Sequence, residues 1–309
     1  MPLQVGIAKL NQSGDNILEW LNPAPDAIES GGLTEILDAS GCVVIESRTA
    51  ELTTEEANQY GAWNLLGLAS SHLADIVEEQ QRRGLFTIGL LPNCNGLMGM
   101  LAGFQKSGPN AKPLRVGLIW FDAHGDINTP ETTLSGLLAG MPVAIATGLC
   151  LERLRIQCGL EVALPTRCIT MVGVRDVDPL EQEILDASDI EYITSDEIRE
   201  LSSSITQQVQ RLQKITDIIY VHVDIDVLDS KEIPGHGLPV EEGPNVSELG
   251  TALEMMFKNP KVGGLGIAGY PVGRDPDRIT LRAIHELVRY AVKGVNTRGR
   301  RTKRGPPEI

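Results

Sequence analysis

Residues 115–126 read RVGLIWFDAHGD, an almost wholly apolar run that ends in two aspartates and a histidine. Because apolar and polar residues do not alternate in this run, it is typical of a strand that is covered on both faces. Residues 218–226, which read IIYVHVDID, have the same design. The carboxyl ends of parallel strands meet at one edge of a sheet, where ligands bind. The two stretches therefore predict a parallel sheet with Asp and His side chains gathered at one edge.

Similar runs rich in Val and Ile predict eight strands, at 3–8, 41–47, 85–91, 115–121, 167–173, 190–194, 218–223 and 262–268. Amphipathic segments between them predict helices at 30–39, 97–105, 135–147, 179–188, 246–258 and 274–293. Capping boxes at Thr53-x-x-Glu56 and Thr194-x-x-Glu197 predict two more helices, the first running to about Arg83. This alternation favours an α/β class fold with three layers, α/β/α, around a mostly parallel sheet of about eight strands.

Composition limits the classes of function. The 309 residues carry a net charge of −14, which argues against nucleic acid as the main partner. No apolar run reaches the roughly 20 residues that a membrane helix needs, and the first residues do not resemble a secretory signal. Five scattered cysteines are typical of a reduced, cytoplasmic protein. We expect residues 1–293 to form a single domain and residues 294–309 to form a basic, flexible tail.

The polar side chains at the two strand ends predict a metal centre. Three potential ligands alternate at Asp122, His124 and Asp126, and two more follow at Asp224 and Asp226. Several carboxylates in one crevice repel one another, and a pair of divalent cations relieves that repulsion. Mixed oxygen and imidazole ligands suit Mn²⁺ or a comparable ion. Asp-rich turns that cap helices are the alternative, but two such clusters after apolar strands favour metal.

Three motifs resemble the arginase family of ureohydrolases: FDAHGDINTPETTLSG at 121–136, VDIDVLD at 223–229 and VGVRDVDP at 172–179. The resemblance extends over residues 3–293. It implies an arginase-like fold, a small guanidino or amidino substrate, a possible homo-oligomer and hydrolysis of a linear amidine C–N bond. It also implies that two divalent ions, Mn²⁺ in expectation, are held by Asp122, His124, Asp126, Asp224 and Asp226.

The sixth metal ligand of the family is a His in a turn that here reads Leu91-Pro-Asn93-Cys94-Asn95. Cys94 therefore takes the His position. A thiolate can bind metal, and we expect the start of the following helix to lower the thiol pKa. Such a ligand shifts the preference toward zinc-like ions. The alternative is that Cys94 is a small core residue and only one ion binds well.

The resemblance also implies substrate contacts. Asn128 and Ser135 match positions that contact the substrate α-carboxylate, and Asp178 matches one that contacts the α-amino group. Each also has a local alternative, as a turn residue or a helix N-cap. Matches at these positions favour a substrate with a free amino-acid end over agmatine.

Three positions depart from the arginase pattern: Ala139 replaces a proton-shuttle His, Gly269 replaces a Glu that pairs with the guanidinium, and Leu238 replaces a Thr. A strongly basic guanidinium would lack its partner here, whereas an N-hydroxyguanidine depends less on it. A branch acting on Nω-hydroxy-L-arginine looks similar, with Cys at the metal turn and no shuttle His. The hypothesis is hydrolysis of Nω-hydroxy-L-arginine to ornithine and hydroxyurea; arginase or agmatinase activity and a regulatory, metal-binding pseudoenzyme are the alternatives.

The expected mechanism is metal-assisted attack of water on the guanidino carbon. Asp126 would hydrogen-bond that water and move its proton. His236, in the sequence Pro234-Gly-His-Gly237, is a candidate replacement for the shuttle His. An exposed loop histidine is the alternative for this residue.

Overall fold

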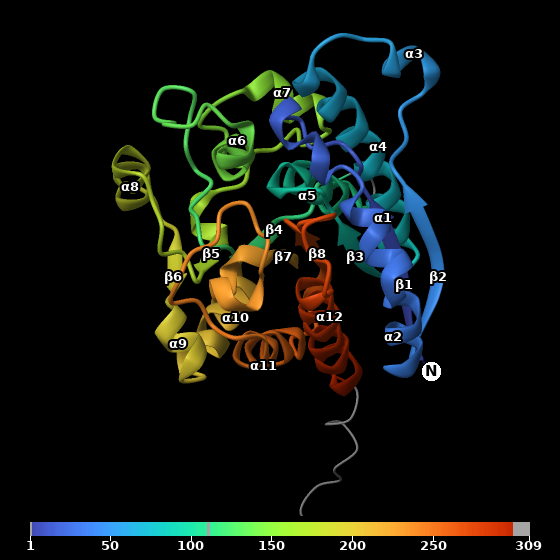
Figure 1. The fold of residues 1–309 in the computed structure, drawn as a ribbon, viewed down its shortest axis with the longest axis vertical. Coiled ribbons are helices and arrows are strands. Elements are labelled where there is room, and N and C mark those ends of the chain that lie inside the picture. Colours follow the sequence, from blue (N-terminus) through green and yellow to red (C-terminus); the bar gives the residue numbers. More distant parts are fainter. Residues whose placement is uncertain (1, 110–111, 299–309) are drawn as a thin grey trace, which may run out of the picture.

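A computed structural model describes residues 2–109 and 112–298. Its centre is one eight-stranded sheet in the order β2-β1-β3-β8-β7-β4-β5-β6 (Figure 1), and every neighbouring pair is parallel. The strands are β1 Leu3–Lys9, β2 Cys42–Thr49, β3 Phe86–Leu90, β4 Val116–Phe121, β5 Ile169–Val172, β6 Glu191–Ile193, β7 Ile218–Asp224 and β8 Val262–Ala268. The eight predicted strands and the three-layer class are therefore confirmed.

Helices cover both faces of this sheet. They are α1 Ala24–Ile28, α2 Thr34–Ala39, α3 Thr54–Ala57, α4 Ala62–Arg82, α5 Leu97–Lys106, α6 Pro142–Thr147, α7 Glu152–Gln157, α8 Pro179–Asp186, α9 Ser195–Arg199, α10 Ser203–Ile215, α11 Val246–Phe257 and α12 Ile279–Thr297. One apolar core lies between the sheet and α1, α2 and α9–α12. A second core lies between the other face and α4–α8. No described helix is long and apolar enough to span a membrane.

Strand β4 shows why its sequence does not alternate. Leu118 and Trp120 belong to one core, while Ile119 and Phe121 belong to the other, and all four are fully buried. Burying such side chains stabilises the fold by about 1.5–3 kcal/mol each. Both faces of the strand therefore demand apolar residues, and polar residues first become possible where the strand ends.

Two predicted helices are wrong in extent. The helix expected from Thr53 to Arg83 is broken after α3, and α4 begins only after Gly61, whose φ of +97° cannot continue a helix. The helix expected at 135–147 is a loop followed by a short 3-10 helix, η5 Leu138–Gly140, and then α6. Pro142 lacks the N–H that a helix interior needs, so it stands at the first position of α6.

The last helix begins later and ends later than predicted. Helix α12 begins at Ile279, five residues after the predicted start at residue 274. The Asp275 carboxylate accepts hydrogen bonds from the backbone N–H groups of Ile279 and Leu281, in the first turn of this helix. The helix continues to Thr297, so the first residues of the predicted 294–309 tail are helical. Residues 299–309 lie outside the described part of the chain.

Candidate metal centre and substrate pocket

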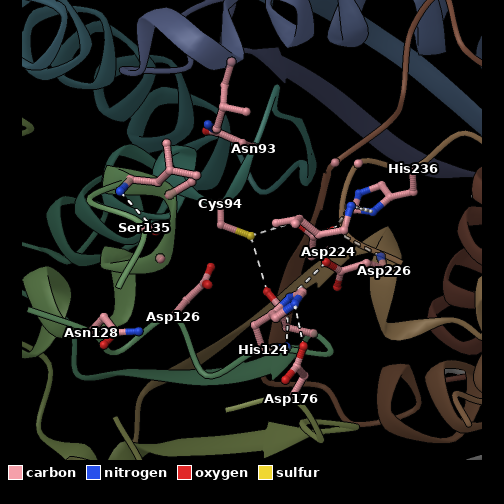
Figure 2. A pocket seen from close by; sticks show the side chains of 18 of the residues that line it. Asn93, Cys94, His124, Asp126, Asn128, Ser135, Asp176, Asp224, Asp226 and His236 are labelled. Atoms are coloured by element: carbon pink, nitrogen blue, oxygen red, sulfur yellow. Dashed lines mark hydrogen bonds and ion pairs between the residues drawn. The ribbon is translucent and has the colours of Figure 1, made fainter. Parts of the chain in front are cut away.

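The polar residues predicted at strand ends converge on one edge of the sheet. Asp122 directly follows β4, and Asp224 is the last residue of β7. Cys94 opens a short 3-10 helix, η3 Cys94–Gly96, after β3, and Asp226 lies in another, η7 Ile225–Val227. Because these three strands are central and parallel, their carboxyl ends bring the four side chains to one pocket. Figure 2 shows Cys94, Asp224 and Asp226 side by side there.

Cys94 faces two of the carboxylates. Its Sγ donates to Asp224 Oδ2 at 3.0 Å and lies 3.5 Å from Asp122 Oδ2. Burial, together with the charges of Asp224, Asp122 and Asp126, raises the pKa of the thiol well above its usual range. The prediction that the start of the following helix lowers the pKa of Cys94 is therefore wrong. The 3-10 helix η3 is short, and the neighbouring carboxylates have the larger effect on the thiol. A cation at this place would favour the thiolate.

The imidazole of His124 lies near three carboxylates. Its Nδ1 is 3.3 Å from Asp122 Oδ1 and 3.1 Å from Asp226 Oδ2, while Nε2 is 3.8 Å from Asp176 Oδ2. Burial lowers the pKa of His124, but the hydrogen bonds to Asp122 and Asp226 outweigh it and raise that pKa to about 12. The acids around His124 thus favour a positive charge at this place, and a bound metal ion would take the place of the imidazole proton, because histidine ligates metal in its neutral form.

The buried carboxylates show why this crevice suits cations. Burial, followed by the charges of its neighbours, raises the pKa of Asp122 well above its usual range. Burial also raises the pKa of Asp224, with Asp226 adding to the effect. Asp226 is the exception, because hydrogen bonding from His124 overcomes burial and lowers its pKa to about 2. Burying this many acids without cations is unfavourable, since each must be protonated or paired.

Donor atoms gather into three overlapping groups, each with its members within 4.8 Å of one another. The groups are Cys94, Asp122 and Asp224; Asp122, His124 and Asp226; and Asp224, Asp226 and His236. Sulfur, imidazole and carboxylate donors in adjoining groups match the chemistry of first-row divalent ions. The residues present therefore fit a metal centre with more than one ion.

Asp126 is placed differently from the other expected ligands. It belongs to none of the three groups that the described residues form. It points into the same pocket from the side of Asn128 (Figure 2). Its φ of +48° is rare for a residue with a side chain, and its carbonyl accepts the Val143 N–H at 2.9 Å. A local backbone constraint therefore sets where this carboxylate stands.

His236 lies at the opposite wall. Its Nε2 is 4.0 Å from Asp224 Oδ1, and its side chain is only 11% exposed, so the structure does not place it as an exposed loop residue. The backbone N–H of Leu238 donates to Nδ1 at 3.3 Å. This contact assigns the hydrogen of a neutral imidazole to Nε2, which faces the carboxylates. Arg274 stacks on Trp20, which lines the same pocket, with its guanidinium carbon 3.9 Å from the ring centroid.

A pocket of about 260 Å³ opens above these groups. The three expected substrate-binding residues, Asn128, Ser135 and Asp178, all line it. Asn128 Nδ2 donates to Asp178 Oδ2 at 3.2 Å, which joins two of them. Ala139, Leu238 and Gly269 line it too, so the three departures from the arginase pattern face the place where a substrate would lie.

Sequence reasoning missed two carboxylates that shape this pocket. Asp15 Oδ2 accepts the backbone N–H groups of Leu138 and Ala139, at 2.9 and 3.4 Å. Glu181 is buried, and its Oε1 accepts the Ile127 N–H at 2.9 Å. Glu181 had a signal, since it stands three residues after Asp178 as in a capping box. Asp15 had none, because its partners are more than 120 residues away.

Comparisons with known proteins point to one family. The model of the arginase family matches residues 97–293. The arginase of Bacillus caldovelox is 32% identical over 190 residues, which are 61% of this chain and 62% of that protein, less than two thirds of its length. Arginase-1 of Sus scrofa is 30% identical over 223 residues, 70% of this chain and 68% of that protein.

Solved structures show the same fold. The crystal structure of arginase from Bacillus subtilis has a TM-score of 0.82 and 25% identity, with 94% of this chain and 98% of that chain covered. Arginase from Entamoeba histolytica, solved in complex with L-ornithine, has a TM-score of 0.80 and 25% identity, with 94% and 99% covered.

Proposed function

Because the chain belongs to the arginase family, we propose that it is a metal-dependent hydrolase of a C–N bond in a linear guanidine or amidine. The observation that carries this proposal is the set of three overlapping donor groups at the floor of one pocket. Ligands for two ions, with Mn²⁺ as the expected metal, would come from Cys94, Asp122, His124, Asp126, Asp224 and Asp226. Bound there, the ions would lower the pKa of a water toward about 7 and polarise the guanidino group.

The pocket wall around Asn128 supports a substrate with an amino-acid end. Asp178 offers a carboxylate to an α-ammonium group, while the Asn128 amide and the Ser135 hydroxyl can donate to an α-carboxylate. The 3.2 Å bond from Asn128 to Asp178 holds both side chains in fixed orientation. In this proposal the reacting guanidino group then extends toward the donor groups.

Two side chains of this pocket can handle protons. In this proposal Asp126 hydrogen-bonds the attacking water and accepts its proton. His236 presents Nε2–H to the pocket and can donate a hydrogen bond to the leaving amine. It can deliver a proton only as an imidazolium, which carries hydrogen on both nitrogens, so the 3.3 Å contact from Leu238 to Nδ1 must first open.

Residues 139 and 269 favour a less basic substrate than arginine. Neither Ala139 nor Gly269 brings a charge to the pocket they line. An N-hydroxyguanidine is less basic than the guanidine of arginine. It therefore depends less on a carboxylate partner for binding and on an acid that protonates the leaving amine. We therefore favour Nω-hydroxy-L-arginine, split into ornithine and hydroxyurea. Arginine is the second candidate, because the four relatives described above are named arginases and one of them was solved with L-ornithine.

A metal and turnover measurement tests the proposal. The purified protein is analysed for bound metal and then assayed with Mn²⁺ on arginine, Nω-hydroxy-L-arginine, agmatine and guanidinobutyrate. Faster turnover of the N-hydroxy compound is the expected result, and faster turnover of arginine would assign a plain arginase. Metal without turnover of any compound would favour a binding protein, and the absence of both would overturn the proposal.

A further inference from the structure

Arg175 is a half-buried cation whose guanidinium donates its hydrogen bonds to backbone carbonyl oxygens of the described residues. Its Nε donates to Glu241 O at 2.8 Å, and Nη1 donates to Gly173 O at 2.9 Å. The remaining acceptors, at 3.0–3.2 Å, are the carbonyls of Asp226, Val227, Leu228 and Val240. A guanidinium has five N–H groups in a rigid fork, so this arrangement uses the whole fork.

Three of those carbonyls belong to the turn that carries a proposed metal ligand. Residues 226–228 contain Asp226 and begin two positions after the last residue of β7, Asp224. Arg175 holds the carbonyl of Asp226, while the carboxylate of the same residue has other partners. Its Oδ1 accepts the Ala123 N–H at 3.1 Å, and its Oδ2 lies near His124.

The backbone of Arg175 is tied to the other metal motif. The N–H groups of Arg175 and Asp176 both donate to the carbonyl of Ala123, at 2.8 and 3.0 Å. Ala123 stands between Asp122 and His124 in the sequence. One residue therefore connects the two motifs, through its main chain on one side and its guanidinium on the other.

The geometry points to Arg175 as a positioning residue: we propose that it sets the separation between the Asp122–His124 and Asp226 motifs, and so determines metal affinity. This inference rests on the proposed metal centre. A purely electrostatic role is the competing explanation, because the cation lies near Asp226 and Asp122. The two differ in what a lysine would do, since lysine keeps the charge but has only three donors on a flexible stem.

The test compares Arg175→Lys and Arg175→Gln with wild type and with Arg199→Lys. Arg199 is a matched control, because it also donates to carbonyls of the 240–243 loop, those of Glu242 and Gly243, but to none at 226–228. Mn²⁺ affinity is measured by calorimetry, and amide hydrogen exchange is followed at Leu228 and Asp229. Loss of a group that orients metal ligands typically weakens metal binding about 10- to 100-fold.

Both Arg175 variants should bind Mn²⁺ about 10- to 100-fold more weakly and exchange faster at residues 228–229, with Arg199→Lys unchanged. If Arg175→Lys keeps the Mn²⁺ affinity and the amide exchange of wild type, the inference is overturned. It is also overturned if Arg175→Gln alone binds Mn²⁺ more tightly, because that is the result expected if Arg175 acts only through its charge. Global unfolding of both variants would make Arg175 merely structural and also overturn it. If wild type itself binds no Mn²⁺, the proposed function fails, while the exchange comparison still decides whether Arg175 holds the turn.

Discussion

A Cβ atom on Gly269 would lie 2.4 Å from Asp224 Oδ1, closer than real side-chain atoms come. Gly269 also has a φ of +83°, a conformation that disfavours any other residue. The position where the arginase pattern has a glutamate is thus one that a side chain could occupy only if Asp224 moved. The absence of that glutamate and the position of Asp224, a proposed metal ligand, are therefore linked, because a side chain at position 269 would need space that Asp224 occupies.

Replacing Gly269 tests this relationship. Gly269→Ala should lose both stability and Mn²⁺ affinity, and Gly269→Glu should not create arginine turnover. Gly273→Ala is the matched control, because Gly273 has a φ of +77° but open space around its Cβ. The backbone cost alone is about 1–2 kcal/mol, so thermal unfolding should show a larger loss at position 269. Equal losses in the two variants, with unchanged Mn²⁺ binding, would contradict the prediction.

Cys94 should be a metal ligand. Loading the protein with Co²⁺ should give a thiolate-to-metal charge-transfer band, which Cys94→Ser abolishes. The serine variant should also prefer Mn²⁺ over Zn²⁺ more strongly than wild type, because oxygen replaces a soft sulfur ligand. Cys158→Ala, at a buried cysteine next to Met98, should keep the band. If the band survives in Cys94→Ser, the cysteine is only a core residue.

His236 should contribute to the chemical step. General acid or base groups typically contribute about 10²- to 10⁴-fold, so His236→Ala should slow saturated turnover by an amount in that range. His236→Gln keeps an N–H donor without transferring a proton, so recovery of the rate in this variant would identify a hydrogen-bonding role. His72→Ala serves as the control, because it removes a histidine of α4 that pairs with Glu56 of α3. An unchanged rate in His236→Ala removes the residue from the mechanism.

Asp178 should select the α-amino group of the substrate. Asp178→Asn removes the charge but leaves a side chain that still caps α8, so folding should persist. We expect KM to rise about tenfold or more for substrates that carry an α-amino group, as for a lost charged hydrogen bond of about 1.5–3 kcal/mol. Guanidinobutyrate, which lacks that group, should show no such rise. A similar change in KM for both substrates would argue against the assignment.

Acid stability should depend on Asp217, at the far end of the sheet from the pocket. Hydrogen bonding from Arg115, at 2.8 Å, lowers the pKa of Asp217 to about 2. A depressed pKa adds stability that is present above the unfolded value of about 3.9 and is lost as the pH falls toward 2. Asp217→Asn should therefore cost up to about 1 kcal/mol at pH 7 and nothing near pH 2, since this pair is partly exposed. Unfolding measured at both pH values checks the difference.

The sequence by itself determined the strands and the candidate ligands beside them. Continuous apolar runs such as 116–121 fit only a strand buried on both faces, and the polar residues stand directly where such runs stop. Parallel order then brings Asp122 and Asp224 to one edge of the sheet without further information. Breaks in helices were harder to predict, because the loop at 58–61 interrupts a pattern that otherwise continues.

Only the tertiary structure decided how the pocket is held together. The bonds from Arg175 to Asp226 and Val240 join residues 51 and 65 positions apart, and Asp15 meets Leu138 over 123 positions. Local patterns carry no record of such contacts, because they depend on which loops the completed sheet brings side by side. The close approach of Gly269 to Asp224 is of the same kind: the sequence shows that a glutamate is missing, and the fold shows that Asp224 leaves no room for a Cβ at this position.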